Sequence, residues 1–155
     1  HPDHIAIHKH TVSAFDVAGD PTQFPESGAP WAPDHLYWGA FTMKRFAGMF
    51  LELEKRGLMP EGIDPERRAR FDAALQQPDP PVSHLVDVRD FVDWKRRAAG
   101  MHRSQFGENS MMARIPDDLR ELFYGEERFL RARPEHQLAE TPARGLEALL
   151  PGKLA

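Results

Sequence analysis

Hydrophobic residues recur at helical spacing along most of the chain, in segments that proline-rich stretches separate. The first segment carries a stripe with steps of three and four residues: Ile5, His8, Val12 and Phe15. This spacing predicts a helix over residues 4–18 that Asp3 caps and whose stripe packs on another part of the protein. The stretch over residues 20–33 contains four prolines, which exclude a helix interior or a central strand. We therefore expect a long loop there.

The same reasoning predicts further helices. Thr42 is a suitable cap for a helix over residues 43–56 that ends at Gly57, and Asp64 followed by Pro65 marks another helix start. The remaining predicted helices are one over residues 89–103 with a buried face of Phe91, Trp94 and Ala98, a short one from Pro116 to Gly125, and a terminal one from Thr141-Pro142 that carries Leu146, Leu149 and Leu150. The chain is therefore expected to be rich in helix.

Three short segments are typical of strands. They are "DHLYWGAF" at 34–41, "SHLVDV" at 83–88 and "ERFLRA" at 127–132, with a proline-rich connection over residues 76–82. Two or three short strands among five or six helices predict an α/β fold, but they are too few to complete a sheet. We expect residues 1–133 to form part of one domain and residues 134–155 to form a tail with a short helix.

Composition limits the classes of function. The 155 residues carry a net charge of −4, which gives no general attraction to nucleic acid or to an anionic membrane surface. The basic runs "RRAR" at 67–70 and "KRR" at 95–97 lie in charge-mixed stretches and are interpreted as solvated helix faces. No apolar run is long enough to span a bilayer, and a cytoplasmic location is expected. The chain has no cysteine, so any metal must be held by His, Asp or Glu, which suits an open catalytic zinc site.

The first ten residues, "HPDHIAIHKH", hold the candidate chemistry. Pro2 keeps His1 extended, and Asp3 is two residues away, so both side chains can lean to the same side. A carboxylate hydrogen-bonded to an imidazole fixes the orientation of the ring, as a general acid or an oxyanion-stabilising histidine requires. His4 then lies in the first helical turn as a candidate metal ligand.

Two further histidines of this segment have less specific roles. His4 and His8 are four residues apart, as in zinc proteases, but Ile5 stands where those enzymes place a glutamate, so the protease interpretation fails. His8 belongs to the apolar stripe and is predicted to be a hydrogen-bonded core or supporting residue, whereas His10 is predicted to face solvent. A polar chain end that binds nothing is the alternative for the whole cluster.

Three segments in order resemble a known family. They are "HPDHIAIHKHTVSAFDVAGDP", "FPESGAPWAPDHLYW" and "VDVRDFVDWKRRAAGMHRSQ", and they resemble the C-terminal half of the LmbE-like (PIG-L) zinc deacetylases, which include N-acetylglucosaminyl-inositol deacetylases and mycothiol S-conjugate amidases. The resemblance implies a Rossmann-like fold and Zn²⁺ as cofactor. It implies that His4 is a zinc ligand and that His1, oriented by Asp3, supports the oxyanion or protonates the leaving amine.

The chain departs from the family in one large respect. It has no early "HPDD" turn, which in the family supplies two zinc ligands and the general base. We therefore expect a fragment that needs the missing N-terminal half of the same domain and is inactive alone. The implied reaction is hydrolysis of a linear amide, the N-deacetylation of an N-acyl amino sugar or a related small molecule. A stand-alone, non-catalytic binding module and a metal-binding helix using His4 and His8 are the alternatives.

Some residues are candidates for contact with substrate. The family has a similar helix end, so His102, Ser104 and Gln105 match pocket-lining positions, although such residues also commonly satisfy the carbonyls at a helix end. Trp31, with Tyr37 and Trp38, can form an apolar wall beside a sugar ring, although core packing is the commoner use of such aromatics.

Overall fold

The computed structural model of the chain describes residues 1–59, 62–104, 115–135 and 141–149. The chain divides into two compact units, of which the first comprises residues 1–38 and 131–137, and the second residues 39–130 and 138–155. The boundary between the units falls within two strands, β1 (Leu36–Gly39) and β3 (Glu126–Arg133). Each of these strands therefore continues from one unit into the other.

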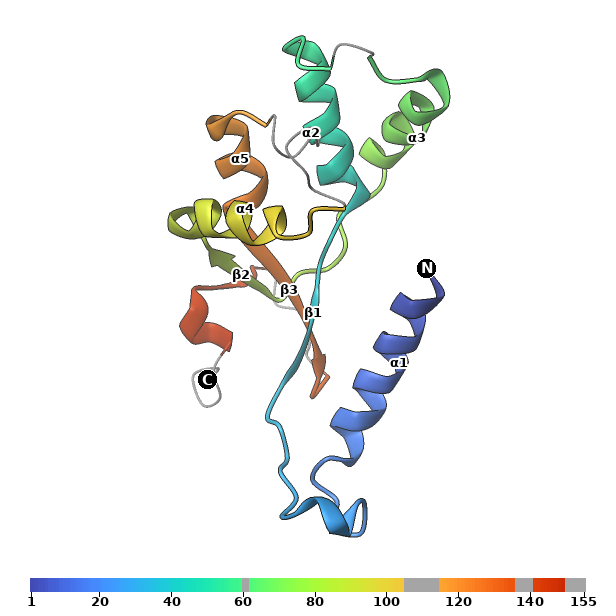
Figure 1. Ribbon diagram of the computed structural model, residues 1–155, viewed down its shortest axis with the longest axis vertical. Coiled ribbons are helices and arrows are strands. Elements are labelled where there is room, and N and C mark those ends of the chain that lie inside the picture. Colours follow the sequence, from blue (N-terminus) through green and yellow to red (C-terminus); the bar gives the residue numbers. More distant parts are fainter. Residues whose placement is uncertain (60–61, 105–114, 136–140, 150–155) are drawn as a thin grey trace. The chain divides into compact units, whose positions relative to one another are not determined.

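The described strands form one mixed sheet of four, in the order β1-β3-β2-β4 (Figure 1). β2 (His84–Asp87) pairs antiparallel with β3, with His84 opposite Phe129. β4 (Ala143–Arg144) pairs parallel with β2 on its other side. The three strands predicted from the sequence are confirmed, and the α/β class is confirmed with them. A mixed sheet with helices between its strands is consistent with part of a Rossmann-like fold.

The fourth strand, β4, lies where the sequence predicts a helix. The backbone N–H of Ala143 donates to the Ser83 carbonyl at 2.9 Å, and that of Gly145 donates to Leu85 at 3.0 Å, so the segment pairs with the edge of β2. Gly145 adopts a φ of +94°, which a right-handed helix does not contain. Only a short 3₁₀ turn, η4 (Leu146–Leu149), follows. The predicted terminal helix is wrong at its start, because edge pairing of the backbone prevails over the apolar spacing of the leucines.

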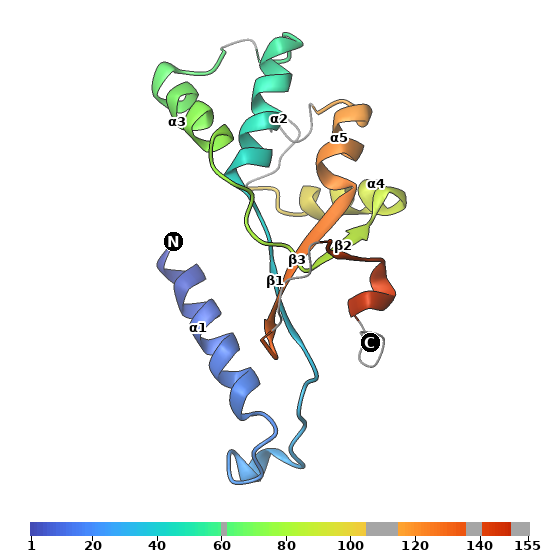
Figure 2. The same ribbon diagram turned by 180° about the vertical axis from the view of Figure 1, so that it is seen from behind.

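The core of the second unit lies among three helices. α2 (Met43–Lys55) lies between α3 (Pro65–Leu75) and α5 (Asp117–Tyr124) in both views (Figure 1 and Figure 2). Their apolar faces and Ile115, which lies just before α5, form one buried cluster: Ala47, Met49, Phe50, Leu53, Phe71, Ile115 and Leu119. Within it, the rings of Phe50 and Phe71 lie 5.3 Å apart at a tilt, a favourable aromatic arrangement.

The predicted starts of α2 and α3 are confirmed by their caps. The hydroxyl oxygen of Thr42 accepts from the Arg45 N–H at 2.9 Å, and a carboxylate oxygen of Asp64 accepts from the Arg67 N–H at 2.9 Å. Each bond satisfies one of the backbone N–H groups that a helix leaves unpaired at its start. Gly57 ends the first of these helices with a φ of +70°, the left-handed conformation that glycine adopts without strain.

The predicted buried face of the helix over residues 89–103 is wrong. The structure has a 3₁₀ turn, η2 (Arg89–Phe91), followed by α4 (Val92–Gly100). Val92 is buried, whereas the side chains of Phe91 and Trp94 are 58% and 65% exposed, and Ala98 is exposed as well. α4 packs on α5, and the ammonium of Lys95 donates to the Tyr124 carbonyl at 2.9 Å. These contacts turn Val92 and Lys95 inward, and the aromatic face points to solvent.

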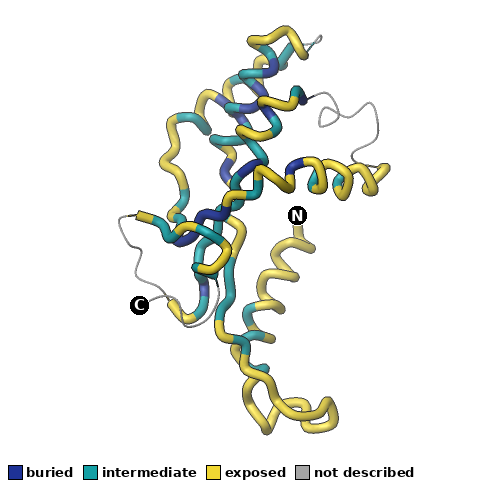
Figure 3. The backbone as a smooth tube through the Cα atoms, turned by 90° about the vertical axis from the view of Figure 1, so that its left-hand side faces the viewer, coloured by how far each residue is buried: buried dark blue, intermediate teal, exposed yellow. Residues whose placement is uncertain are grey.

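The first unit contains α1 (Pro2–Val17), a loop with the short turn η1 (Pro25–Ser27), and the start of β1. No residue of α1 is buried, and the helix is exposed over most of its length (Figure 3). Val12 and Phe15 are half-buried, whereas Ile5 is 58% exposed. The predicted stripe therefore makes packing contacts only in its second half. None of the described helices is both long and apolar enough to cross a lipid bilayer.

The carboxylate of Asp87 at the end of β2 has a strongly shifted pKa. Both of its oxygens lie 3.0 Å from the Arg89 Nε, and the Arg89 backbone N–H donates to one of them at 3.1 Å. Hydrogen bonds from the Arg89 side chain, and then from its backbone, lower the pKa of Asp87 from 3.8 to about 2. Folding thus favours the ionised form of Asp87. Its contribution to the stability of the folded state is fully present above pH 3.8 and is lost as the pH falls through about 2.

Replacement of Arg89 tests this assignment. We expect Arg89→Gln to raise the pKa of Asp87 toward its ordinary value, because the charged donor is removed and the backbone donor remains. The measurement is an NMR titration of the Asp87 carboxyl carbon. Arg70→Gln is the matched control, since Arg70 pairs with Glu66 in α3 and does not contact Asp87. An unchanged Asp87 titration in Arg89→Gln would show that the guanidinium is not the cause.

Candidate functional site

The candidate chemistry of the chain lies at the start of α1, where the helix begins earlier than the sequence predicts. Pro2, rather than His4, is the first helical residue, and His1 replaces Asp3 as the N-cap. The His1 carbonyl accepts from the His4 N–H at 3.1 Å, the first bond of the helix. Proline is favoured at this position because its fixed φ is already helical and its missing N–H is not needed there. Asp3 and His4 consequently both lie in the first turn.

His1 and Asp3 are in direct contact. The Nδ1 of His1 lies 3.3 Å from the backbone nitrogen of Asp3 and 3.3 Å from its carboxylate Oδ2. The two contacts need different forms of the ring. In the tautomer with a bare Nδ1, the nitrogen accepts from the Asp3 N–H and caps the helix. With a proton on Nδ1, it donates to the Asp3 carboxylate. The carboxylate–imidazole pair predicted from the sequence is therefore within reach, although helix capping, rather than extended backbone, brings the two residues together.

His4 lies beside His1 in the same turn. Their ring centroids are 6.2 Å apart, and the rings are tilted by 60°. Imidazole nitrogens are suitable ligands for zinc, and a catalytic zinc takes three protein ligands. Within residues 1–59, 62–104, 115–135 and 141–149, however, no group of three His, Asp or Glu side chains could hold a metal ion. The donor type fits zinc but the number does not, so the described residues alone do not form a zinc site.

The other two histidines of α1 are exposed. The ring of His8 lies 5.2 Å from that of Trp38, so His8 contacts an aromatic ring at the surface. The prediction that it is a core residue is wrong, because every residue in the first half of α1 is exposed. The exposure predicted for His10 is confirmed.

The candidate substrate-binding residues are distributed over both units. Trp31 belongs to the loop of the first unit and is 72% exposed. His102 and Ser104 follow α4 in the second unit and are exposed, and the backbone N–H of His102 donates to the Ala99 carbonyl at 3.0 Å. Gln105 lies outside the described residues. Their contact with a substrate stays a prediction.

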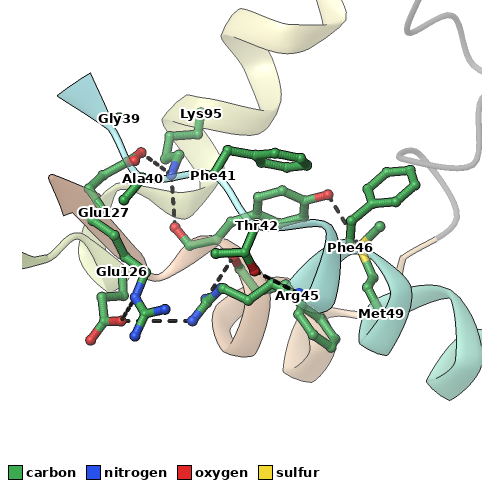
Figure 4. A pocket seen from close by; sticks show the side chains of 13 residues that line it. Gly39, Ala40, Phe41, Thr42, Arg45, Phe46, Met49, Lys95, Glu126 and Glu127 are labelled. Carbon is green, nitrogen blue, oxygen red and sulfur yellow. Dashed lines mark hydrogen bonds and ion pairs between the residues drawn. The ribbon is translucent and has the colours of Figure 1, made fainter. Parts of the chain in front are cut away.

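The sequence did not indicate a cavity of about 300 Å³ in the second unit (Figure 4). Its lining includes Lys95, from a basic run that the sequence presents as a solvated helix face. The ammonium is half-buried and bonds to Tyr124 and Glu127. No spacing rule could have found this site, because residues from five elements meet there. The only local signal is the Thr42 cap directly after the aromatic Phe41.

The start of α1 thus brings imidazole and carboxylate groups together at one end of a helix in an α/β chain. Comparison with known proteins gives a closer assignment. The chain is 29% identical over 135 residues to a 1D-myo-inositol 2-acetamido-2-deoxy-alpha-D-glucopyranoside deacetylase of Rhodococcus jostii. The aligned region covers 86% of the chain and 44% of that protein. It is 36% identical over 108 residues to deacetylase 1 of the same name from Frankia alni, covering 68% of the chain and 36% of that protein. It is 26% identical over 132 residues to a Mycothiol S-conjugate amidase of Streptomyces coelicolor, and this alignment covers 83% of the chain and 44% of that protein.

These relatives confirm the resemblance found in the sequence. The chain is a homologue of the LmbE-like (PIG-L) family of deacetylases and amidases. It spans less than half the length of each of these three proteins. No protein-family model and no solved structure matches it.

Proposed function

We propose that the chain is the C-terminal part of a zinc-dependent amide hydrolase that removes the acyl group from an N-acyl amino sugar or a related small molecule. The observation that carries the proposal is the turn at the start of α1, where His1 contacts Asp3 and His4 lies alongside. Homology to deacetylases and an amidase supports the reaction class. His4 supplies one zinc ligand, and the other ligands come from a segment N-terminal to His1.

Each residue of the turn has a distinct task in this proposal. The Asp3 carboxylate orients the His1 ring through Nδ1, at 3.3 Å. His1 then directs a proton or a hydrogen bond to the oxygen or nitrogen of the amide as charge develops there. Zinc, when bound, supplies Lewis acidity that polarises the amide carbonyl and activates water.

Exposed apolar side chains support the need for a further segment. On α1, Ile5 and Ile7 are 58% and 67% exposed, and on α4 Trp94 is 65% exposed. Large apolar residues on the same helices as polar ones are usually covered by another element. In the proposed whole enzyme, the N-terminal segment covers apolar surface of α1 and brings its zinc ligands to His4.

A chimaera tests the proposal, with the N-terminal segment of the Frankia alni deacetylase joined to this chain. The assay is the release of acetate from 1D-myo-inositol 2-acetamido-2-deoxy-alpha-D-glucopyranoside. We expect Asp3→Asn to retain zinc but to lower kcat by about ten- to hundredfold, because the amide holds His1 in the wrong tautomer. Zinc content and kcat are measured on the same preparation.

Asp34→Asn is the matched control, since Asp34 is also an exposed carboxylate of the first unit. It is expected to leave both zinc content and kcat unchanged. Equal kcat in Asp3→Asn and Asp34→Asn would contradict the role given to the His1–Asp3 pair. A chimaera that binds zinc fully and releases no acetate would contradict the proposed reaction.

A further inference from the structure

The cavity of the second unit combines an apolar interior with charged groups at one side. It lies between the end of β1, the first turns of α2, the end of α5 and the start of β3, and Lys95 reaches it from α4 (Figure 4). Its volume of about 300 Å³ is at the lower end of the range of small-molecule sites. We propose that this cavity binds a small planar aromatic molecule that carries one carboxylate. The proposal is independent of the deacetylase assignment.

The apolar part of the cavity offers ring faces and a thioether. Phe41 and Phe46 have ring centroids 6.2 Å apart at a tilt of 58°. The Tyr124 hydroxyl donates to the Met49 sulfur at 3.3 Å, so its oxygen is turned toward the protein. Burial raises the pKa of Tyr124, which therefore stays neutral and presents an uncharged ring. Aromatic rings and methionine sulfur pack favourably on flat aromatic ligands.

Phe41 has an exposure that suits a ligand contact. Its side chain is 71% exposed although it directly precedes the buried cap Thr42. It contributes little to the core of the unit but belongs to the wall of the cavity. A planar ligand would remove apolar surface of Phe41 from water, which favours binding.

The charged side of the cavity has one more positive than negative side chain: Arg45, Lys95 and Arg128 against Glu126 and Glu127. Lys95 donates to the Tyr124 carbonyl at 2.9 Å and to Glu127 at 2.5 Å. An ammonium has three donors, so within the described residues these two bonds leave one N–H of Lys95 for a ligand.

The second acid of the cavity is shared by arginines. Glu126 Oε1 lies 3.3 Å from Arg128 Nε and 3.8 Å from Arg45. The Arg45 guanidinium also donates to the carbonyls of Leu122 and Phe123, at 3.4 and 3.3 Å, which fixes it at the end of α5. Both acids are thus already bound to cations. A ligand cation would have to compete for them, whereas a ligand carboxylate meets the excess positive charge.

Calorimetric titration of the 155-residue chain with 2-naphthoate tests the proposal. Acetate and 2-naphthylmethylammonium serve as comparison ligands, since acetate lacks the rings and the ammonium compound reverses the charge. We expect 2-naphthoate to bind with one site and at least about tenfold more tightly than either comparison ligand, because each lacks one of the two complementary features.

Two variants locate the binding. Lys95→Gln is expected to weaken 2-naphthoate binding roughly five- to tenfold, since a partly solvated charged donor is removed. Phe41→Ser is expected to weaken it to a similar extent through lost ring contact. The matched controls are Lys55→Gln, at a lysine whose side chain is 79% exposed, and Phe91→Ser, at a phenylalanine 58% exposed. Neither control residue lines the cavity.

Circular dichroism establishes that each variant is folded. Lys95→Gln and Phe41→Ser are measured separately, so each tests the proposal by itself. Three results would overturn the proposal. They are no binding of 2-naphthoate at millimolar concentration, equal binding of the ammonium compound, or equal loss of affinity in the test and control variants. The last result would place any bound naphthoate elsewhere on the protein.

Discussion

His4→Ala in the chimaera is expected to remove most of the bound zinc and to reduce acetate release by at least about a thousandfold. Catalytic zinc is held by three protein ligands, and the loss of one leaves two, too few to retain the ion through purification. The measurement is the zinc content by mass spectrometry after gel filtration, followed by the acetate assay. The effect is large because the remainder of the site depends on the metal being in place.

The other histidines of α1 supply the controls. His10→Ala removes an exposed imidazole from the same helix and is expected to change neither zinc content nor activity. His8→Ala distinguishes the proposed site from a metal-binding helix, in which His4 and His8 would share the ion. Zinc loss in His8→Ala equal to that in His4→Ala would favour the metal-binding helix, and full zinc in His4→Ala would refute the assignment of His4.

Leu53→Ala is expected to lower the free energy of unfolding by about 3 kcal/mol. Leu53 is 1% exposed and lies in the buried cluster of α2, α3 and α5. Truncation removes its apolar contacts and leaves a cavity that helices packed from both sides cannot close. Urea denaturation of the 155-residue chain, followed by circular dichroism, measures the change.

Leu122→Ala is the matched control for stability. Leu122 lies on α5 but is 63% exposed, so its truncation is expected to change the free energy of unfolding by no more than about 0.5 kcal/mol. Equal destabilisation by the two substitutions would mean that the buried cluster does not hold the second unit together. A change confined to Leu53→Ala would identify α2 as the element around which the unit is built.

Local chemistry made much of the second unit predictable from the sequence. Thr42 and Asp64 can each accept a hydrogen bond from a backbone N–H three residues ahead, and Gly57 can adopt a positive φ without strain. Such signals act within one helical turn and do not depend on the rest of the protein. The sequence motif at His1, Asp3 and His4 is of the same kind, since three residues within one turn are close in any helix that begins there.

The tertiary structure decided which faces are buried. The spacing of Phe91, Trp94 and Ala98 predicts a buried stripe, but the contacts of Val92 and Lys95 with neighbouring elements turn the helix by about one residue. A periodic pattern predicts which residues share the apolar face of a helix. It does not predict which other element packs on the helix, and that packing decides which residues are buried.

The cavity and the fourth strand likewise depend on contacts between distant residues. Lys95 meets Glu127, and Ala143 pairs with Ser83, across separations that no local spacing encodes. The sequence by itself therefore determined the caps at Thr42 and Asp64 and the stop at Gly57, together with the α/β class and the residues of the proposed zinc turn. Only the folded chain decided that His1 caps α1, that the edge of β2 takes up β4, and that Lys95 reaches an aromatic cavity. The reason is that hydrogen bonds and apolar burial between distant segments exceed the weak local preferences of the residues involved.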